Sequence, residues 1–190
     1  MMINLPYHPI INHFIQKYDY KSYLELGVRN KNSTHNHIQC QLKEGVDVNA
    51  SCNPTYVMTT DVFFESHASE RLWDIIFIDA CHKKEYVARD FENSLKHLSE
   101  GGTIIMDDVN PFTKLYTESQ YCWNAWEVFA ELRGTRSDLE MYTIHSSFCG
   151  IVRRGKQKTH NLQIKPTWEF LQQNRQKLLN TITWEEVLKK

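Results

Sequence analysis

The feature that most constrains the fold is a series of short apolar runs that end in acidic or small residues and are followed by helix-like segments. The runs cover residues 23–26, 45–48, 56–58, 73–78 and 103–106, and helical patterns are expected over 33–43, 62–70 and 84–99. This alternation predicts a parallel sheet. Residues 75–78 are continuously apolar, as expected of a central strand that is covered on both faces.

The later part of the chain is expected to complete the sheet. Ser99 to Gly102 are expected to end the helix that precedes the fifth strand. The fourth strand, this helix and the fifth strand then form a β-α-β unit. Residues 123–133 predict a helix, and 140–145 and 148–153 predict two strands joined by a short turn. We therefore predict one doubly wound, mostly parallel sheet of seven strands that closes with an antiparallel hairpin.

The length of 190 residues is that of one domain, which we place at residues 1–155. The tail from Gly155 is rich in Lys and Gln and carries one amphipathic side, formed by Trp168, Phe170, Leu171, Leu178, Leu179 and Trp184. Residues 156–190 are therefore expected to be a helical extension that packs on the domain or on a second subunit.

Charge and composition exclude several classes of partner. With 22 basic and 23 acidic side chains, the net charge of -1 provides no field of one sign for a polyanion, so nucleic acid and anionic membranes are not expected partners. The chain shows no targeting segment and no apolar run long enough to span a membrane. Its five scattered cysteines predict reduced thiols in a cytoplasmic protein.

Acidic residues lie at successive strand ends, where a doubly wound sheet binds its ligands. They are Glu25 before Gly27, Asp47, Asp61, Asp79, and the pair Asp107 and Asp108. Turns are also rich in Asp for local reasons, but five such ends in succession favour a binding site. The single glycine after the first strand lacks the G-x-G-x-x-G pattern, which argues against NAD, and no P-loop motif is present.

Asp79, Asp107 and Asp108 are expected to end two adjacent strands. Three carboxylates in one cleft would repel one another unless a hard cation such as Mg²⁺ neutralised them or some stayed protonated. The alternative for Asp107 or Asp108 is a cap on the segment that follows.

His82 follows Asp79 by three residues and is a candidate base for a hydroxyl proton, since the unperturbed pKa of histidine is about 6.5. His145 is a reserve candidate. Five other histidines are interpreted as surface residues without a role: His35, His37, His67, His97 and His160.

Five segments together resemble the class I S-adenosylmethionine-dependent methyltransferases, and most closely the small branch tied to glycan and natural-product modification. They are residues 23–29 (YLELGVR), 46–48, 58–64, 73–82 (WDIIFIDACH) and 98–109 (LSEGGTIIMDDV). The resemblance covers about residues 20–155. It implies a Rossmann-like fold and S-adenosylmethionine as the cofactor.

Carried over by position, the resemblance implies a set of cofactor-binding residues. Glu25 and Gly27 would line the methionine and ribose end, Asp47 would hold the ribose hydroxyls, and Asp61 would lie near adenine. Arg29, Asp79 and Ala80 complete the expected set. Lys31 stands where the family usually has a second glycine.

The resemblance also implies a reaction site. Asp79 with Asp107 and Asp108 is similar to the Mg²⁺ site of the metal-dependent O-methyltransferases of the catechol and caffeoyl types. His82 matches a histidine that is frequent in the glycan-linked branch. We therefore expect His82, Asp79 and Asp108 to be catalytic and Asp79, Asp107 and Asp108 to bind metal.

The predicted function is methyl transfer to a hydroxyl of a sugar, nucleotide sugar or glycan. Trp123, Tyr116 and Tyr121 are candidates to stack on the acceptor, whereas Trp126 is expected to be buried in its helix. A phenolic or other natural-product acceptor is the alternative within enzymes. A non-catalytic partner subunit that binds the cofactor and an NAD-linked oxidoreductase are further alternatives. The oligomeric state stays open, with a homo-oligomer among the options.

Overall fold

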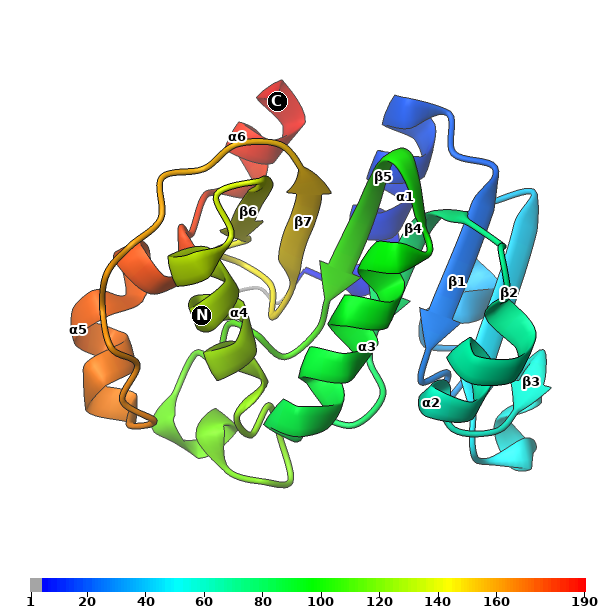
Figure 1. Ribbon diagram of the computed structural model, residues 1–190, viewed down its shortest axis with the longest axis horizontal. Helices are drawn as coiled ribbons and strands as arrows, with labels where there is room; N and C mark the ends of the chain where they lie inside the picture. The colour runs from blue at the N-terminus through cyan, green and yellow to red at the C-terminus, as the bar shows by residue number, and fades with distance from the viewer. Residues whose placement is uncertain (1–4) are drawn as a thin grey trace. The chain divides into compact units, whose positions relative to one another are not determined.

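The computed structural model describes residues 5–190 and contains the predicted alternation of strands and helices (Figure 1). The strands are β1 (Ser22–Leu26), β2 (Leu42–Asp47), β3 (Tyr56–Val57), β4 (Trp73–Ile78), β5 (Leu98–Met106), β6 (Leu139–Thr143) and β7 (Gly150–Arg154). The helices are α1 (Tyr7–Tyr18), α2 (Thr60–Phe63), α3 (Lys84–Lys96), α4 (Ala125–Thr135), α5 (Trp168–Leu179) and α6 (Trp184–Lys189).

The seven strands form one sheet in the order β3-β2-β1-β4-β5-β7-β6. β1 pairs in parallel with β2 and β4, and β2 pairs in parallel with β3, whereas β6 and β7 are antiparallel. The predicted fold class is therefore confirmed, including the antiparallel hairpin at the end. All four residues of 75–78 are buried, as the unbroken apolar run predicts.

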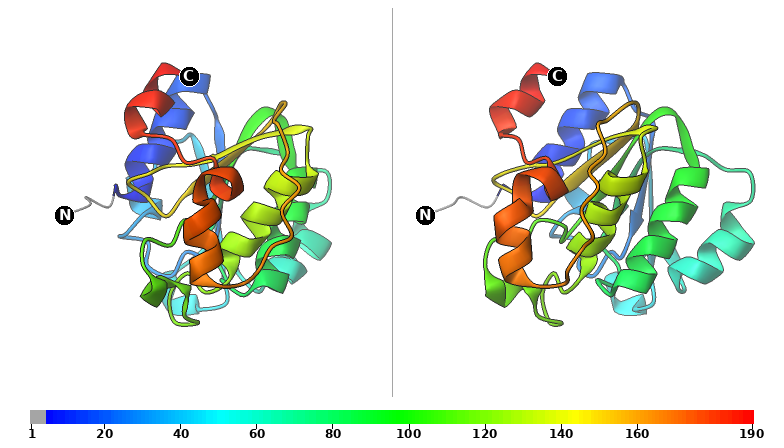
Figure 2. Two further views of the ribbon diagram at one scale, coloured as in Figure 1. Left: turned by 90° about the vertical axis from the view of Figure 1, so that its left-hand side faces the viewer. Right: turned by 60° about the vertical axis from the view of Figure 1, so that its left-hand side comes forward.

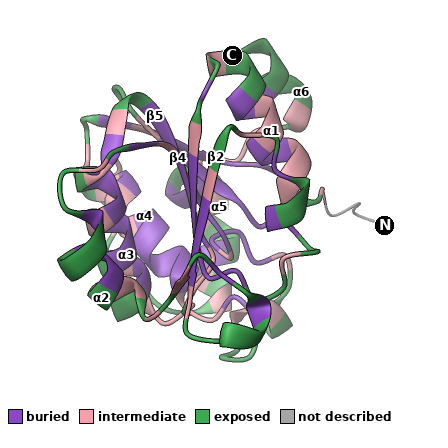
Figure 3. Ribbon diagram, turned by 90° about the vertical axis from the view of Figure 1, so that its right-hand side faces the viewer, coloured by how far each residue is buried: buried purple, intermediate pink, exposed green. Residues whose placement is uncertain are grey.

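The chain divides into two compact units. The first unit comprises residues 6–81 and 85–105, and the second comprises Leu5, residues 82–84 and 106–190. In the first unit, α1 lies on one face of the strands and α2 and α3 lie on the other (Figure 3). Phe14 of α1, Leu24 of β1 and Phe91 of α3 are at most 2 % exposed. Each such side chain contributes about 1.5–3 kcal/mol by leaving water.

The second unit is built on the β6–β7 hairpin. The helix α5 packs on α4 and β6, and the chain after α5 forms an isolated parallel bridge between Ile144 and Ile182. Residues 156–166 run without helix or strand from β7 to α5 (Figure 2). A boundary at residue 155 between a domain and an extension stays a prediction.

The predicted helix over 33–43 is wrong. Only a single 3₁₀ turn, His35–His37, forms there, and β2 already begins at Leu42. The side chain of Asn12 in α1 donates to His37 O (2.9 Å) and accepts from Gln39 N–H (2.8 Å). These bonds satisfy backbone groups that a helix would otherwise pair, and the polar segment offers no apolar stripe to bury.

Three further boundaries differ from prediction. Gly101 and Gly102 lie inside β5 instead of ending the preceding helix, because α3 stops at Lys96. The expected helix over 62–70 is the short α2 followed by a wider, π-type turn over Phe64–Ala68. The helix α1 was not predicted, although Ile10, Ile11, Phe14 and Ile15 give it a buried stripe at helical spacing.

All five cysteines are free thiols, as expected. Within residues 5–190, every helix is too short or too polar to cross a lipid bilayer.

Asp90 of α3 is a buried carboxyl group that couples stability to pH. It is 1 % exposed, its Oδ2 has no hydrogen-bond partner within residues 5–190, and burial raises its pKa to about 6 from 3.8. Because the folded state holds this proton more tightly, the contribution of Asp90 to stability is greatest below about pH 4 and falls as the pH rises to about 6. The loss is about 3 kcal/mol.

We expect Asp90→Asn to raise the free energy of unfolding at pH 7 by about 1–3 kcal/mol. The same substitution should remove this fall between pH 4 and 6. Urea unfolding of both proteins across that range measures the effect, with Glu92→Gln on the exposed side of α3 as the matched control. An unchanged difference between pH 4 and 7 in Asp90→Asn would contradict the assignment.

Candidate active site

Gly27 lets the end of β1 approach the end of β4. Its φ is +88°, and a Cβ at this position would lie 2.1 Å from the backbone oxygen of Asp79. Asp79 N–H in turn donates to Leu26 O at 2.8 Å. Only glycine fits this approach, because any side chain would collide with the backbone after β4.

Asp47 at the end of β2 orders the loop that follows Gly27. Its Oδ2 accepts from Arg29 N–H at 2.8 Å, and its Oδ1 accepts from Asn49 N–H at 2.7 Å. Arg29 has φ of 45°, so the left-handed positions of this loop are Gly27 and Arg29, while Lys31 is not one of them. The bulky side chain of Lys31 therefore causes no strain at the position where the family usually has glycine.

Glu25 has a buried partner that the sequence did not reveal. Its Oε2 lies 2.6 Å from His35 Nδ1, and both side chains are less than 10 % exposed. Burial raises the pKa of the Glu25 carboxyl group, and the contact with His35 opposes that shift. The interpretation of His35 as a surface residue is wrong, since it is the buried residue of the 3₁₀ turn. No pattern links positions 25 and 35, so only the fold could show the pair.

Asp61 lies in the first turn of α2 and forms a two-pronged ion pair with Arg89 of α3. The distances are 2.9 Å from Nη2 to Oδ2 and 3.1 Å from Nε to Oδ1. This contact joins two helices on one face of the first unit. The predicted place of Asp61 near adenine stays a prediction.

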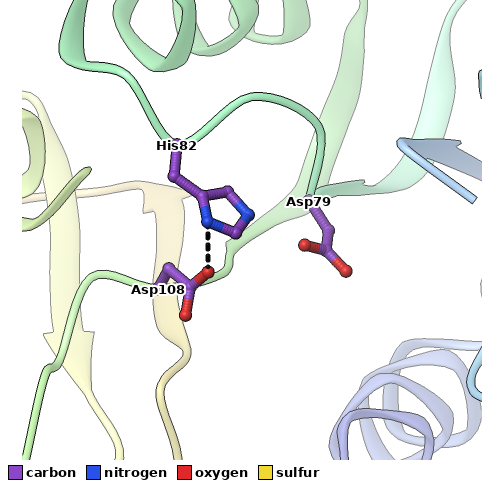
Figure 4. Close-up of side chains that lie close together, drawn as sticks. All are labelled: Asp79, His82 and Asp108. Atoms are coloured by element: carbon purple, nitrogen blue, oxygen red, sulfur yellow. Dashed lines mark ion pairs between the residues drawn. The ribbon is translucent and has the colours of Figure 1, made fainter. Parts of the chain in front are cut away.

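His82 and Asp108 form the central pair of the second unit (Figure 4). His82 Nδ1 lies 2.8 Å from Asp108 Oδ2 and 2.7 Å from the backbone oxygen of Tyr121. Both neighbours are acceptors, so Nδ1 carries the hydrogen and Nε2 is the basic nitrogen of the neutral ring. The arrangement orients the imidazole through Nδ1.

Asp108 has a left-handed backbone conformation. Its φ is 60°, and its N–H donates to the Oδ1 of Asp107 at 2.7 Å. Aspartate tolerates this region better than most residues, yet it still costs about 1–2 kcal/mol. Such strain at the end of a central strand is typical of functional sites, because it aims a side chain that an extended chain would direct elsewhere. Here it brings Asp108 to His82.

The loop that carries His82 is held by the segment before α4. Lys84 N–H donates to Asn124 Oδ1 at 2.9 Å, and Lys84 Nζ pairs with Glu131 and lies 3.5 Å from Glu127. These supports were not predicted. The spacing of Glu127 and Glu131, four residues apart on one side of a helix, is a signal that could have found the ion pairs of Lys84.

Cys122 lies beside the same pair. It is buried, and burial next to Asp108 and Asp107 raises the pKa of its thiol. The thiol is therefore protonated at neutral pH and offers a hydrogen to the Asp108 carboxylate. This excludes a thiolate nucleophile at Cys122.

The aromatic residues before α4 behave differently from one another. Trp126 is 2 % exposed, which confirms that it is part of the core. Tyr116 packs edge-on against Tyr121, with ring centroids 5.4 Å apart, and also contacts Phe148. Tyr121 is 37 % exposed, and its backbone oxygen accepts from His82 Nδ1.

The predicted site residues thus fall into two sets, one in each compact unit. The first unit brings together Glu25, Gly27, Arg29, Asp47 and Asp79, and the second brings together His82, Asp107 and Asp108. Asp79 and Ala80 follow β4 directly, and Asp107 and Asp108 follow its neighbour β5. The chain connects Asp79 to His82 through only two intervening residues, which limits their Cα atoms to about 11 Å apart.

Residues 25–109 match the family model described as a methyltransferase domain. No curated protein matches the sequence. Among solved structures, the cofactor-bound Rv0187 from MTB shares 14 % identity with a TM-score of 0.58, and 80 % of each chain is covered. The O-methyltransferase TomG from Streptomyces achromogenes, in complex with SAM, shares 13 % identity with a TM-score of 0.52, and 77 % of each chain is covered.

A third similar structure is the MycE methyltransferase of the mycinamycin pathway, in complex with Mg, SAH and mycinamycin VI. Identity is 14 % and the TM-score is 0.54, over 83 % of this chain and 51 % of MycE. At these identities the likeness shows the fold. The family-model match supports a methyltransferase domain over residues 25–109.

Proposed function

We propose that this protein is an S-adenosylmethionine-dependent O-methyltransferase that acts on a hydroxyl of a sugar, nucleotide sugar or glycan with the help of a divalent cation. The observation that carries the proposal is the His82–Asp108 pair, which follows the sheet strands in a chain matched as a methyltransferase domain. The pair supplies an oriented base, which methylation of a hydroxyl needs.

The residues after β1, β2 and β4 fit the cofactor. When bound, S-adenosylmethionine supplies a methyl group already activated by a sulfonium sulfur. The absent Cβ of Gly27 leaves backbone that a ligand can approach, and each oxygen of Asp47 keeps a further lone pair for a ribose hydroxyl. The proposed binding set is Glu25, Gly27, Arg29, Asp47, Asp61, Asp79 and Ala80.

His82 is the proposed base. Its Nε2 would accept the proton of the acceptor's hydroxyl group. Asp108 then stabilises the imidazolium through the Nδ1 hydrogen bond. Asp107 positions Asp108 through the backbone hydrogen bond, so the carboxylate of Asp108 is held in place before substrate binds.

Asp79, Asp107 and Asp108 are the proposed ligands of a divalent cation. Oxygen donors suit Mg²⁺, which when bound would favour the ionised form of a neighbouring hydroxyl. A carboxylate oxygen has two lone pairs, so Asp107 and Asp108 keep acceptor capacity beyond the bonds from Asp108 N–H and His82 N–H. Asp79 and Asp108 are also two of the three residues, with His82, whose ligand atoms lie within 4.8 Å of one another. MycE, which has a similar fold, binds Mg together with SAH.

A sugar acceptor is favoured over a phenolic one by the site's polarity. Asp108, His82 and Asp107 offer several hydrogen-bonding groups, which suit an acceptor that carries several hydroxyl groups, and Tyr121, whose backbone oxygen bonds His82, is a candidate to stack on a sugar ring. A phenolic acceptor is the second candidate. The five free thiols favour a reducing, cytoplasmic compartment.

The test is thermal unfolding with S-adenosylmethionine, S-adenosylhomocysteine or NAD, each with Mg²⁺ and again with EDTA. A ligand at 100 times its Kd stabilises by about 2.7 kcal/mol, which should raise Tm by roughly 5–10 °C. We expect both adenosyl compounds to raise Tm, NAD to leave it unchanged, and Mg²⁺ to add a further increase. Transfer of labelled methyl to nucleotide sugars, sugar phosphates and catechol then identifies the acceptor.

Three outcomes would contradict parts of the proposal. No response to either adenosyl compound would exclude the cofactor. A response without methyl transfer to any acceptor would favour a non-catalytic subunit. Transfer to catechol alone would move the substrate class from sugars to phenols.

A further inference from the structure

A small polar pocket lies in the second unit, and neither the cofactor site nor the His82–Asp108 pair uses it. It has a volume of about 190 Å³ and is lined by Asn110, Phe112, His145, Gln172, Arg175 and Thr181. This is smaller than the roughly 300 Å³ at which pockets for whole small-molecule ligands begin. Its size therefore suits one charged or polar group of a larger ligand.

Arg175 of α5 places a positive charge in the lining of this pocket. Within residues 5–190 it has no carboxylate partner. Its Nη1 donates to Asn110 Oδ1 at 2.6 Å, and its Nη2 donates to Pro111 O at 2.7 Å. The Trp168 ring lies 5.6 Å from the guanidinium carbon. Glu169, an acid on the same helix, pairs with Lys114. Neutral groups thus hold Arg175 in place without neutralising it.

The guanidinium of Arg175 is partly removed from water without a balancing negative charge. Burial lowers the pKa of the Arg175 guanidinium, yet arginine stays charged in proteins. The two observed bonds use two of its five N–H donors, which leaves three for a ligand. Gln172, Thr181 and His145 bring further hydrogen-bonding side chains to the same pocket. A fixed guanidinium among neutral donors matches the planar, two-pronged recognition of phosphate or carboxylate.

We propose that the Arg175 pocket binds an anionic group, phosphate or carboxylate, of the acceptor, so that the substrate is a charged sugar. The link to the acceptor comes from the chain itself. Asn110 and Pro111, which hold Arg175, are the second and third residues after Asp108, so their Cα atoms lie within about 7–11 Å of that of Asp108. The inference rests on the proposed function for the identity of the ligand as acceptor.

The test is isothermal titration of the full chain, in the presence of S-adenosylhomocysteine, with glucose 1-phosphate, glucuronate and methyl glucoside. We expect one or both anionic sugars to bind at least tenfold more tightly than the neutral one. Glucose 1-phosphate alone would identify a phosphate as the group recognised, and glucuronate alone a carboxylate. Equal affinity for all three sugars would overturn the proposal.

Variants of the pocket residues test whether the anionic sugar binds at Arg175. Arg175→Gln should weaken binding of the anionic sugar at least tenfold, whereas Arg136→Gln, which removes the same charge from a residue paired with Asp138, should leave it unchanged. Because Arg175 also holds the Asn110–Pro111 segment, Gln172→Ala with Thr181→Val is the second variant. It should weaken binding about three- to tenfold without disturbing that segment. Unchanged affinity in both pocket variants would contradict the site.

The design separates this inference from the proposed function. If S-adenosylhomocysteine binds and the anionic sugars do not, the pocket inference fails while the methyltransferase proposal stands. If the anionic sugars bind through Arg175 but S-adenosylhomocysteine does not, the anion site stands and the proposed function fails.

Discussion

Replacing His82 with alanine is expected to lower kcat for methyl transfer by about 10²–10⁴-fold, the range that a positioned general base contributes. The affinity for S-adenosylhomocysteine should stay within about twofold of the wild type, because the substitution changes none of the proposed cofactor residues. The measurement is transfer of labelled methyl to the acceptor found in the screen, together with titration of S-adenosylhomocysteine to show that the variant is folded.

Two further variants test whether the loss of activity is due to the basic nitrogen of His82. His82→Gln keeps a hydrogen-bond donor for Asp108 but has no basic nitrogen, so it should be as inactive as the alanine variant. His67→Ala, which removes an exposed histidine of the π-type turn, should keep full activity. Added imidazole should restore part of the turnover of His82→Ala alone. If His82→Ala retained wild-type kcat, the base role would be excluded, and the acceptor proton would have to leave by another route.

The strands of the sheet, although not their order, could be predicted from the sequence because buried parallel strands carry their own signal. Residues 75–78 are apolar on both faces of the sheet, and the antiparallel β6 and β7 are close enough in sequence to be predicted as a hairpin. Predicting the hairpin requires no contact between residues far apart in the sequence. The helix expected over 33–43 failed for the opposite reason, since its conformation depends on Asn12, more than twenty residues earlier.

The candidate site was predictable in its residue types and not in its contacts. The acids at the strand ends follow from the rule that ligands bind at the carboxyl ends of parallel strands. Three contacts had no local signal: His35 with Glu25, the Tyr121 backbone oxygen with His82, and the support of Lys84 by Asn124. Each joins residues ten to forty positions apart. Such pairs depend on tertiary packing, which residue spacing does not encode.

Asp108→Asn is the second variant with a large expected effect, and we expect kcat to fall about 10²–10⁴-fold. The amide is uncharged, so it stabilises the His82 imidazolium less and is a poorer ligand for a divalent cation. The substitution keeps the left-handed backbone, because asparagine tolerates φ of 60° as aspartate does. Asp19→Asn is the matched control, since Asp19 is exposed and also left-handed, with φ of 54°.

The two proposed roles of Asp108 give different results. If Asp108 acts only by orienting His82, the double variant with His82→Ala will be no less active than His82→Ala alone, because residues that act as a unit are not additive. If Asp108 also binds the cation, Asp108→Asn will raise the Mg²⁺ concentration for half-maximal activity at least tenfold, and the double variant will lose further activity. We expect the second result. Unchanged kcat and Mg²⁺ dependence in Asp108→Asn would exclude both roles and leave the His82–Asp108 pair as a structural contact.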